Sequence, residues 1–448
     1  MYGVWPSAGC FLASRCVLGL MLLATPAPAQ TPRTGTGEGG WSATVAPNNP
    51  PAPIPAPPAS PPAVAPPATS PTAATPEISG TASRSRVLLD LTGDPSVSVF
   101  RLSNPWRVVA DLTNAELVRP IGTVGKDGGL ITGLRAGLFA PGKLRVVIDT
   151  SGPVSIETSR IIAATASTPS RLEIVIAPGS GTASRASELA AAAQSLPADV
   201  VGTGAAAKPR DPRAKPVVII DPGHGGIDPG ARGEVGVEKD IVLAVSSEIR
   251  RALLATRRFD VVMTRTSDVF IPLDQRVQIS RQHNADLFLS IHADSLDSKT
   301  LAKTVRGATV YTLSDKASDA RAQAMADKEN ASDLLAGLPM RPGEDDDHVR
   351  DILVDLMRRE SANLSADFRN LLVGEMRPRL AMARDPFRSA PFRVLRQPGS
   401  PAVLIELGYI SNSSDEKLML TRGWQRTVAT SITAAIEAYF AKRSSAAR

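Results

Sequence analysis

The stretch Val217-Val218-Ile219-Ile220-Asp221-Pro222-Gly223-His224-Gly225-Gly226 largely decides the fold of this chain. Its first four residues are all apolar, as in a strand that is covered by helices on both faces. The glycines on either side of His224 permit a sharp turn and leave room for a ligand. A buried strand that ends in such a turn is typical of an α/β sheet, in which ligand sites lie beyond the carboxyl ends of the strands.

The sequence that follows alternates between strand-length apolar runs and helical periods. Further strands are predicted at 259–264, 287–291, 308–312 and 403–407, and helices at 238–254, 273–283 and 424–440. This alternation predicts an α/β catalytic domain over residues 216–443, with a mostly parallel sheet flanked by helices. Between two of the strands, residues 314–392 show no strand pattern and are predicted to be a helical insertion. Its helices are expected at 318–335, 349–364 and 367–377.

The residues before this domain have a different texture. Short apolar or alternating runs bounded by Gly, Pro, Asn or Asp occur without a helical period at 87–91, 97–100, 106–112, 144–149 and 171–176. They predict a small all-β domain over 84–178, so the protein is multidomain. Residues 30–83 are rich in proline and alanine and are predicted to be an extended linker. Residues 179–215, rich in Ala, Gly and Ser, are predicted to be a second linker.

Residues 1–29 are predicted to be a signal peptide. Their apolar run is too short to span a bilayer as a helix, and Ala27-Pro28-Ala29 has the small-x-small form of a cleavage site. The alternative is an N-terminal membrane anchor. Both cysteines of the chain, Cys10 and Cys16, lie in this leader, so the mature protein has no thiol nucleophile and no cysteine metal ligand. We therefore expect a secreted protein with no membrane span after cleavage.

Charge and composition give little support to nucleic-acid binding. The net charge is only +6 over 448 residues, and aromatic residues make up 4%. A basic groove with stacking aromatic side chains, which single-strand binding requires, is therefore not expected.

Two of the four histidines stand where an α/β sheet places its active site. His224 and His292 each follow a predicted strand, so their imidazoles can converge on one metal ion. A catalytic zinc needs three protein ligands and an open position. Without cysteine the third ligand should be a carboxylate, and Glu238, at the start of a helix, is the best candidate. Glu406 ends the last strand at the same edge and suits a general base.

These residues also have structural interpretations. A histidine at a strand end is often a satisfied polar residue, and Glu238 could be a first-turn glutamate favoured by the helix dipole. Asp221 could be a turn residue. Glu406 is harder to explain in this way, because an acid within an apolar run is costly to bury unless it is paired or functional. His283, at a predicted helix end, is given a structural role. His348 follows an acidic run and is expected at a solvated tip of the insertion.

Residues 217–442 resemble the zinc-dependent N-acetylmuramoyl-L-alanine amidases, the type 3 amidase domain. The matching stretches are 218–226, 228–231, 238–240, 290–294, 329–333 and 405–412, in the order of the family. The resemblance implies a periplasmic Gram-negative enzyme that cleaves the amide between N-acetylmuramic acid and the L-alanine of peptidoglycan stem peptides during wall remodelling and daughter-cell separation. It implies one zinc on His224, Glu238 and His292, with Glu406 catalytic. Residues 84–178 resemble the AMIN domain.

The same resemblance implies autoinhibition. In similar amidases a helix of the insertion covers the zinc, and a LytM-domain activator displaces it. Glu329 is the candidate carboxylate, with Asp327 and Glu344 as alternatives. The insertion could instead merely widen the substrate groove. Two other functions stay open: a different zinc-dependent wall hydrolase, such as a peptidase or deacetylase, and a non-catalytic wall-binding division scaffold.

Overall fold

The computed structural model describes residues 76–118, 121, 129–179, 215–296, 302, 304–339, 352–397 and 399–446. The predicted signal peptide, most of the predicted linker 30–83 and nearly all of the linker 179–215 lie outside these residues. So do Glu344 and His348, two of the residues considered above.

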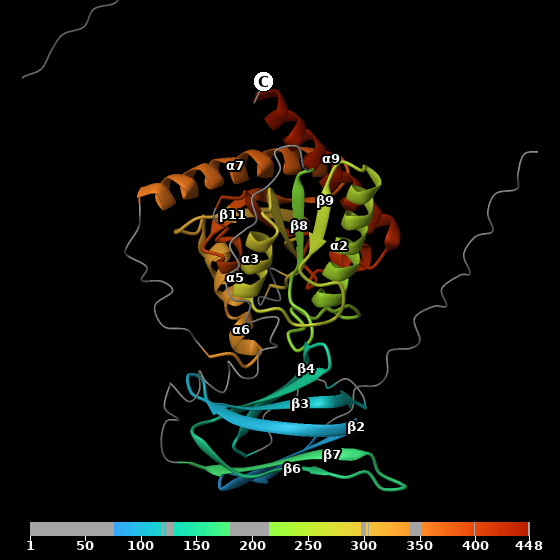
Figure 1. Cartoon of the computed structure of the whole chain (residues 1–448), viewed down its shortest axis with the longest axis vertical. Helices are drawn as coiled ribbons and strands as arrows, with labels where there is room; N and C mark the ends of the chain where they lie inside the picture. Colours follow the sequence, from blue (N-terminus) through green and yellow to red (C-terminus); the bar gives the residue numbers. More distant parts are fainter. Residues whose placement is uncertain are drawn as a thin grey trace, which may run out of the picture. The chain divides into compact units, whose positions relative to one another are not determined.

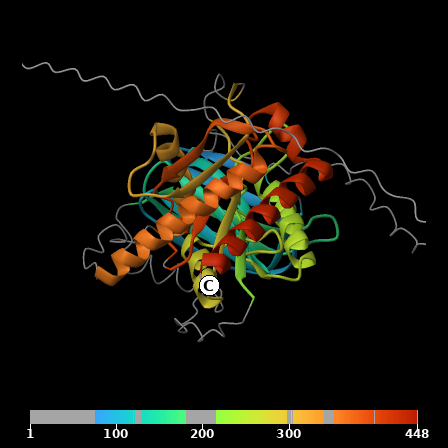
Figure 2. The same ribbon diagram turned by 90° about the horizontal axis from the view of Figure 1, so that it is seen from above.

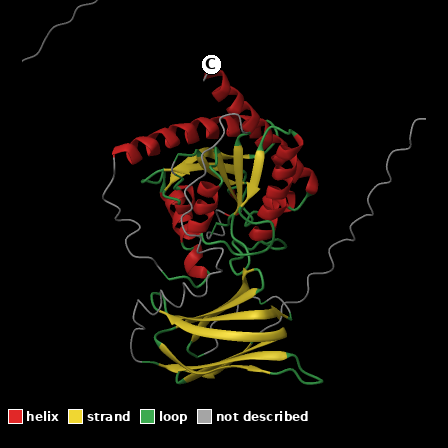
Figure 3. Cartoon of the chain, viewed as in Figure 1, coloured by secondary structure: helices red, strands yellow, loops and turns green. Residues whose placement is uncertain are grey.

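The N-terminal domain is all-β, as predicted (Figure 3). Seven strands form one antiparallel sheet in the order β4-β5-β3-β2-β7-β6, with β1 paired to β2. Alternate residues such as Val87, Leu89 and Leu91 point into one apolar core, which is the period of two expected of a strand. The strands are β1 (Glu77–Thr81), β2 (Arg84–Leu102), β3 (Arg107–Leu117), β4 (Ile131–Ala140), β5 (Lys143–Thr150), β6 (Val154–Ile162) and β7 (Ser170–Pro178).

The strands β4 and β6 were not among the runs predicted from the sequence, and two further details of this domain differ from the prediction. The first strand begins at Glu77, inside the stretch predicted to be linker, because residues 77–81 pair with β2. The two runs predicted at 87–91 and 97–100 belong to one long strand, β2. Its first half pairs with β1 and β7 and its second half with β3, so one strand joins both parts of the sheet.

The second domain is a helix-covered sheet of six strands in the order β12-β11-β13-β10-β8-β9 (Figure 1). Neighbouring strands are parallel except for β11 and β13, which are antiparallel, so the predicted mostly parallel sheet is confirmed. The strands are β8 (Val217–Pro222), β9 (Asp260–Met263), β10 (Leu287–His292), β11 (Ala308–Leu313), β12 (Met382–Ala390) and β13 (Ala402–Glu406).

Helices cover both faces of this sheet. Figure 2 looks onto the layer formed by α2 (Glu238–Ala255), α7 (Ile352–Met376) and α9 (Arg422–Ala446), where α9 contacts both α2 and α7. The opposite face carries α3 (Leu273–Gln282), α5 (Ala320–Asn330) and the short helix η1 (Arg393–Leu395). Successive residues of β8 alternate between the two cores: Val218 and Ile220 face the first layer, and Ile219 faces the second.

The predicted insertion 314–392 is helical, with one exception. It contains α5, α6 (Ser332–Leu335) and α7, but its last part forms the edge strand β12. The prediction that this segment has no strand is therefore wrong. The sequence of β12, Met-Ala-Arg-Asp-Pro-Phe-Arg-Ser-Ala, lacks an apolar run because an edge strand pairs on one side only and tolerates proline. The helix α8 (Ser413–Met419) follows β13. None of the described helices has the length and apolarity to cross a membrane.

Candidate metal and catalytic site

Three neighbouring parallel strands bring the candidate residues together. β10 lies between β8 and β13, and its last residue, His292, pairs in register with Glu406, the last residue of β13. His224 follows β8 in the adjacent turn. The imidazole rings of His224 and His292 are 4.9 Å apart, centroid to centroid. The carboxyl ends of the strands therefore place these side chains at one edge, as parallel pairing requires.

The turn after β8 holds His224 in an unusual backbone conformation. His224 has a φ of 56°, and Gly225 and Gly226 have φ values of 125° and 57°. A left-handed residue other than glycine is uncommon and points to a functional constraint. The Asp228 Oδ2 atom lies 2.9 Å from His224 Nδ1, which leaves His224 Nε2 free to face the site. Asp228 was not predicted as a site residue, because its role depends on the fold of this turn.

Glu238 opens α2 and joins the two histidines. Its Oε2 is 3.3 Å from His224 Nε2, and its Oε1 is 3.3 Å from His292 Nδ1. The same carboxylate accepts backbone N–H groups of Ala231 and Ala293, each at 2.8 Å. Burial alone raises the pKa of Glu238, but the positive charge of His224, reinforced by that of His292, holds that pKa well below its usual range. Glu238 is thus a fixed, ionised carboxylate.

Two imidazole nitrogens of the site are available to bind a metal ion. Within the described residues, His224 Nε2 and His292 Nδ1 are buried and have no hydrogen-bond partner. Burial lowers the pKa of His224, but the carboxylates of Asp228, Glu238 and Glu329 outweigh it and raise that pKa well above the ordinary value. A cation is therefore favoured between these groups, and two imidazoles with carboxylate oxygens are the donor set of a catalytic zinc.

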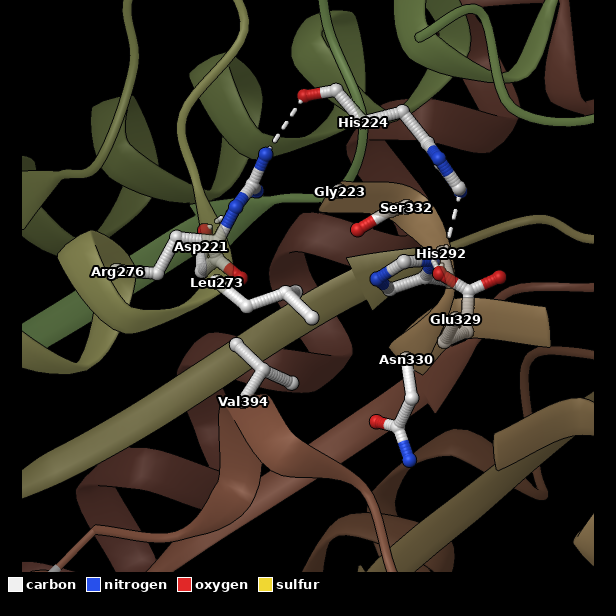
Figure 4. A pocket seen from close by; sticks show the side chains of 10 residues that line it. All are labelled: Asp221, Gly223, His224, Leu273, Arg276, His292, Glu329, Asn330, Ser332 and Val394. Carbon is white, nitrogen blue, oxygen red and sulfur yellow. Dashed lines mark hydrogen bonds and ion pairs between the residues drawn. The ribbon is translucent and has the colours of Figure 1, made fainter. Parts of the chain in front are cut away.

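The candidate Glu329 comes from α5 of the insertion and reaches the same point (Figure 4). Its Oε2 is 3.4 Å from His224 Nε2 and 3.3 Å from His292 Nδ1. These three residues form a group that could hold a metal ion, and all three are buried. The alternative Asp327 is exposed and accepts a hydrogen bond from Gln323. Of the two described alternatives, Glu329 therefore reaches the histidines and Asp327 does not.

Glu406 lies beside this group and is fully buried, at 0% exposure. Its Oε2 accepts the backbone N–H of Asp294 at 3.0 Å, while its Oε1 has no hydrogen-bond partner within the described part of the chain. Burial, followed by the charges of Asp294 and Glu238, raises the pKa of Glu406 well above its usual range. A carboxylate with a raised pKa is a stronger base than an ordinary glutamate, which suits a group that takes and returns a proton.

A second buried network supports the turn that carries His224. Asp221 accepts hydrogen bonds from Thr264 at 2.6 Å, Ser290 at 2.8 Å and Arg276 at 2.8 Å. Arg276 also donates to the carbonyl of His224 at 2.9 Å. Burial opposes ionisation of Asp221, but the Arg276 charge and the hydrogen bonds from Thr264 and Ser290 together outweigh it and lower the pKa of Asp221. Asp221 is thus more than the turn residue considered from the sequence. His283, by contrast, is exposed at the end of α3.

The small pocket at this site is lined by residues of both the sheet edge and the insertion (Figure 4). The insertion contributes Glu329, Asn330 and Ser332 to this lining, and the strand ends contribute His224 and His292. Asn330 donates to the carbonyl of Pro391 at 3.0 Å and accepts the backbone N–H of Arg393 at 2.8 Å. Asn330 therefore attaches the end of α5 at two further points beside the pocket.

A methyl group at Gly223 would displace His292. A Cβ atom built there would lie 2.4 Å from His292 Cε1, closer than any normal contact. We therefore expect Gly223→Ala to weaken zinc binding by about tenfold or more, measured by competition with a chromogenic chelator. Gly374→Ala is the matched control, since a Cβ there would meet nothing within 4 Å. Unchanged zinc affinity in Gly223→Ala would show that His292 is not held where the metal binds.

Comparisons with known proteins agree with this geometry. The N-acetylmuramoyl-L-alanine amidase family matches residues 218–438, and the AMIN domain matches residues 77–176. The amidase AmiA of Salmonella typhimurium is 38% identical over 230 residues, which are 51% of this chain and 77% of AmiA. The amidase AmiC of Escherichia coli O6:H1 is 31% identical over 379 residues, which are 82% of this chain and 89% of AmiC. The resemblance found in the sequence is confirmed, and the chain belongs to the N-acetylmuramoyl-L-alanine amidase family, with an AMIN domain before its amidase domain.

Proposed function

We propose that this protein is a zinc-dependent peptidoglycan hydrolase that cuts the amide between N-acetylmuramic acid and L-alanine and that rests in an autoinhibited state. The observation that carries the proposal is the convergence of His224, Glu238 and His292 on one buried point, with Glu406 beside it. Family membership supports this bond over the one cut by a peptidase or deacetylase. The full set of chemical residues argues against a non-catalytic scaffold.

His224, Glu238 and His292 would hold the zinc, which supplies Lewis-acid polarisation of the scissile carbonyl and a more acidic water. Glu406 accepts a proton from the attacking water at its Oε1, the oxygen without a hydrogen-bond partner among the described residues. Its other oxygen stays anchored to the N–H of Asp294. Glu406 then delivers the proton to the leaving nitrogen of alanine. The buried edge excludes water that would weaken these electrostatic effects.

The proposed autoinhibition rests on Glu329. Its Oε2 lies 3.4 Å from His224 Nε2 and 3.3 Å from His292 Nδ1, so in this proposal it would block the access of substrate and water to the zinc. An activator that binds the open form better would shift the population toward activity. We propose a LytM-domain protein as that activator, and the periplasm, reached through the predicted signal peptide, as the site of action in daughter-cell separation.

Replacing Glu329 by alanine tests this autoinhibition. With an open population on the order of 10% or less, we expect Glu329→Ala to raise basal digestion of dye-labelled sacculi by at least about tenfold, without any partner. Asp327→Ala is the matched control, because Asp327 lies on the same helix but is exposed. If Glu329→Ala folds, binds zinc and stays as slow as the parent protein, the insertion shapes the substrate groove and does not block the metal.

A further inference from the structure

The residue before Glu329 also enters the site. The Lys328 ammonium contacts the Asp294 carboxylate and lies 3.4 Å from Ser295 Oγ. Asp294 and Ser295 directly follow the end of β10, which places them beyond His292. Two successive residues of α5 therefore engage the same strand end, one with a negative group and one with a positive group.

Asp294 is built into the catalytic edge. It is 0% exposed, and its backbone N–H donates to Glu406 Oε2 at 3.0 Å. Its Oδ1 accepts the backbone N–H of Ser295 at 2.6 Å, whereas its Oδ2 is buried without a hydrogen-bond partner within the described residues. Buried polar atoms are normally paired, so the free Oδ2 of Asp294, beside the general base, is suited to a hydrogen-bond donor or a cation.

We propose that Asp294 and Ser295 form an amine subsite, which receives the nitrogen of the leaving L-alanine once the closed insertion has moved away. In the closed state Lys328 occupies this subsite and Glu329 occupies the open position on the metal. These two successive residues of α5 therefore block both the amine subsite and the metal. This inference rests on the proposed amide hydrolysis. The simpler alternative is that Lys328 and Asp294 only fasten the insertion through an ion pair.

The chemistry of amide cleavage produces a positive charge at this place. Water adds its oxygen to the carbonyl carbon, and the C–N bond then breaks with its electron pair on nitrogen. Glu406 returns to that nitrogen the proton it took from water, which gives a primary amine. With a pKa of roughly 8, the amine takes a further proton from solvent and becomes an ammonium near neutral pH. A carboxylate here interacts more strongly with the departing amine nitrogen than with the neutral amide nitrogen of the substrate. This difference favours the reaction.

Binding of product-like peptides to the full-length, zinc-loaded protein tests the subsite without turnover. The probes are the tripeptide L-alanyl-γ-D-glutamyl-L-lysine, with a free amino terminus, and the same peptide acetylated at that terminus. In a Lys328→Ala, Glu329→Ala background, calorimetry at pH 7 should show about tenfold tighter binding of the free-amine peptide. Adding Asp294→Asn should abolish this preference and leave the affinity for the acetylated peptide unchanged. An equal loss for both peptides, or a persisting preference, overturns the proposal.

A second comparison leaves Asp294 intact, in case its replacement disturbs folding. With Glu329→Ala alone, Lys328 still competes for the subsite, so the free-amine peptide should bind about tenfold more weakly than after Lys328→Ala is added. Lys316→Ala, which changes an exposed lysine of the same insertion, should have no such effect. If Lys328→Ala leaves the affinity unchanged, the amine subsite is refuted. Sacculus digestion is measured separately, so a failure of the proposed function is recognised independently.

Discussion

Replacing Glu406 by glutamine is expected to slow peptidoglycan amide hydrolysis by about 10²–10⁴-fold, because the variant can neither accept the proton of water nor return it to the leaving nitrogen. The amide keeps the size of the side chain, and its oxygen can still accept the Asp294 N–H that Glu406 Oε2 now accepts. The fold and the zinc content should therefore not change. Sacculus digestion and metal analysis of the same preparation separate the two effects.

The matched control for this variant is Glu437→Gln on α9, where the glutamate pairs with Arg258 at the surface. This control should digest sacculi like the parent protein. Both variants are best compared in the Glu329→Ala background, so that the low activity of the closed state does not mask the effect of the Glu406 change. Near-normal digestion by Glu406→Gln would show that a residue other than Glu406 transfers the proton.

Replacing His292 by alanine is expected to remove the metal and with it all measurable activity. His292 Nδ1 faces Glu238 and Glu329 and has no hydrogen-bond partner within the described residues, so its loss leaves one imidazole for the zinc. Loss of a supporting residue already costs about 10–100-fold in metal affinity, and loss of a ligand should cost more. Metal content after dialysis measures this directly.

The control is His283→Ala, which changes an exposed histidine at the end of α3. It should keep one zinc per chain and full activity. A His292→Ala protein that retained stoichiometric zinc at unchanged affinity would contradict the assignment of the site. Addition of excess zinc to His292→Ala should restore little activity, since the geometry of the remaining donors is incomplete.

The sequence predicted the α/β domain because its buried strands are continuous apolar runs, and it predicted the site because parallel strands end at one edge. His224, His292 and Glu406 follow directly from that rule. The strand β12 was missed because it pairs at a sheet edge without an apolar run. Residues 349–377 were predicted as two helices, but α7 is continuous through Ser365, whose hydroxyl accepts the Ala402 N–H.

The supporting residues were beyond the reach of sequence patterns. Asp228 orients His224 through a turn with left-handed backbone angles, which no period of apolar residues reveals. The pairing of Asp294 with Lys328 joins two segments that are distant in sequence, so only the packing of α5 on the sheet edge brings them together. The sequence showed His224 between two glycines, but the partners of its side chain depend on the tertiary structure.

The most direct test of the account is product analysis of purified sacculi digested by the full-length Glu329→Ala protein, with and without a chelator. Mass analysis should find peptides with a free L-alanine amino terminus and glycan strands whose muramic acid carries a free lactyl carboxyl group. These products should disappear with the chelator and return when zinc is added. Peptides cut internally, glycans that have lost acetyl groups, or the same products in the presence of the chelator would contradict a zinc-dependent amidase.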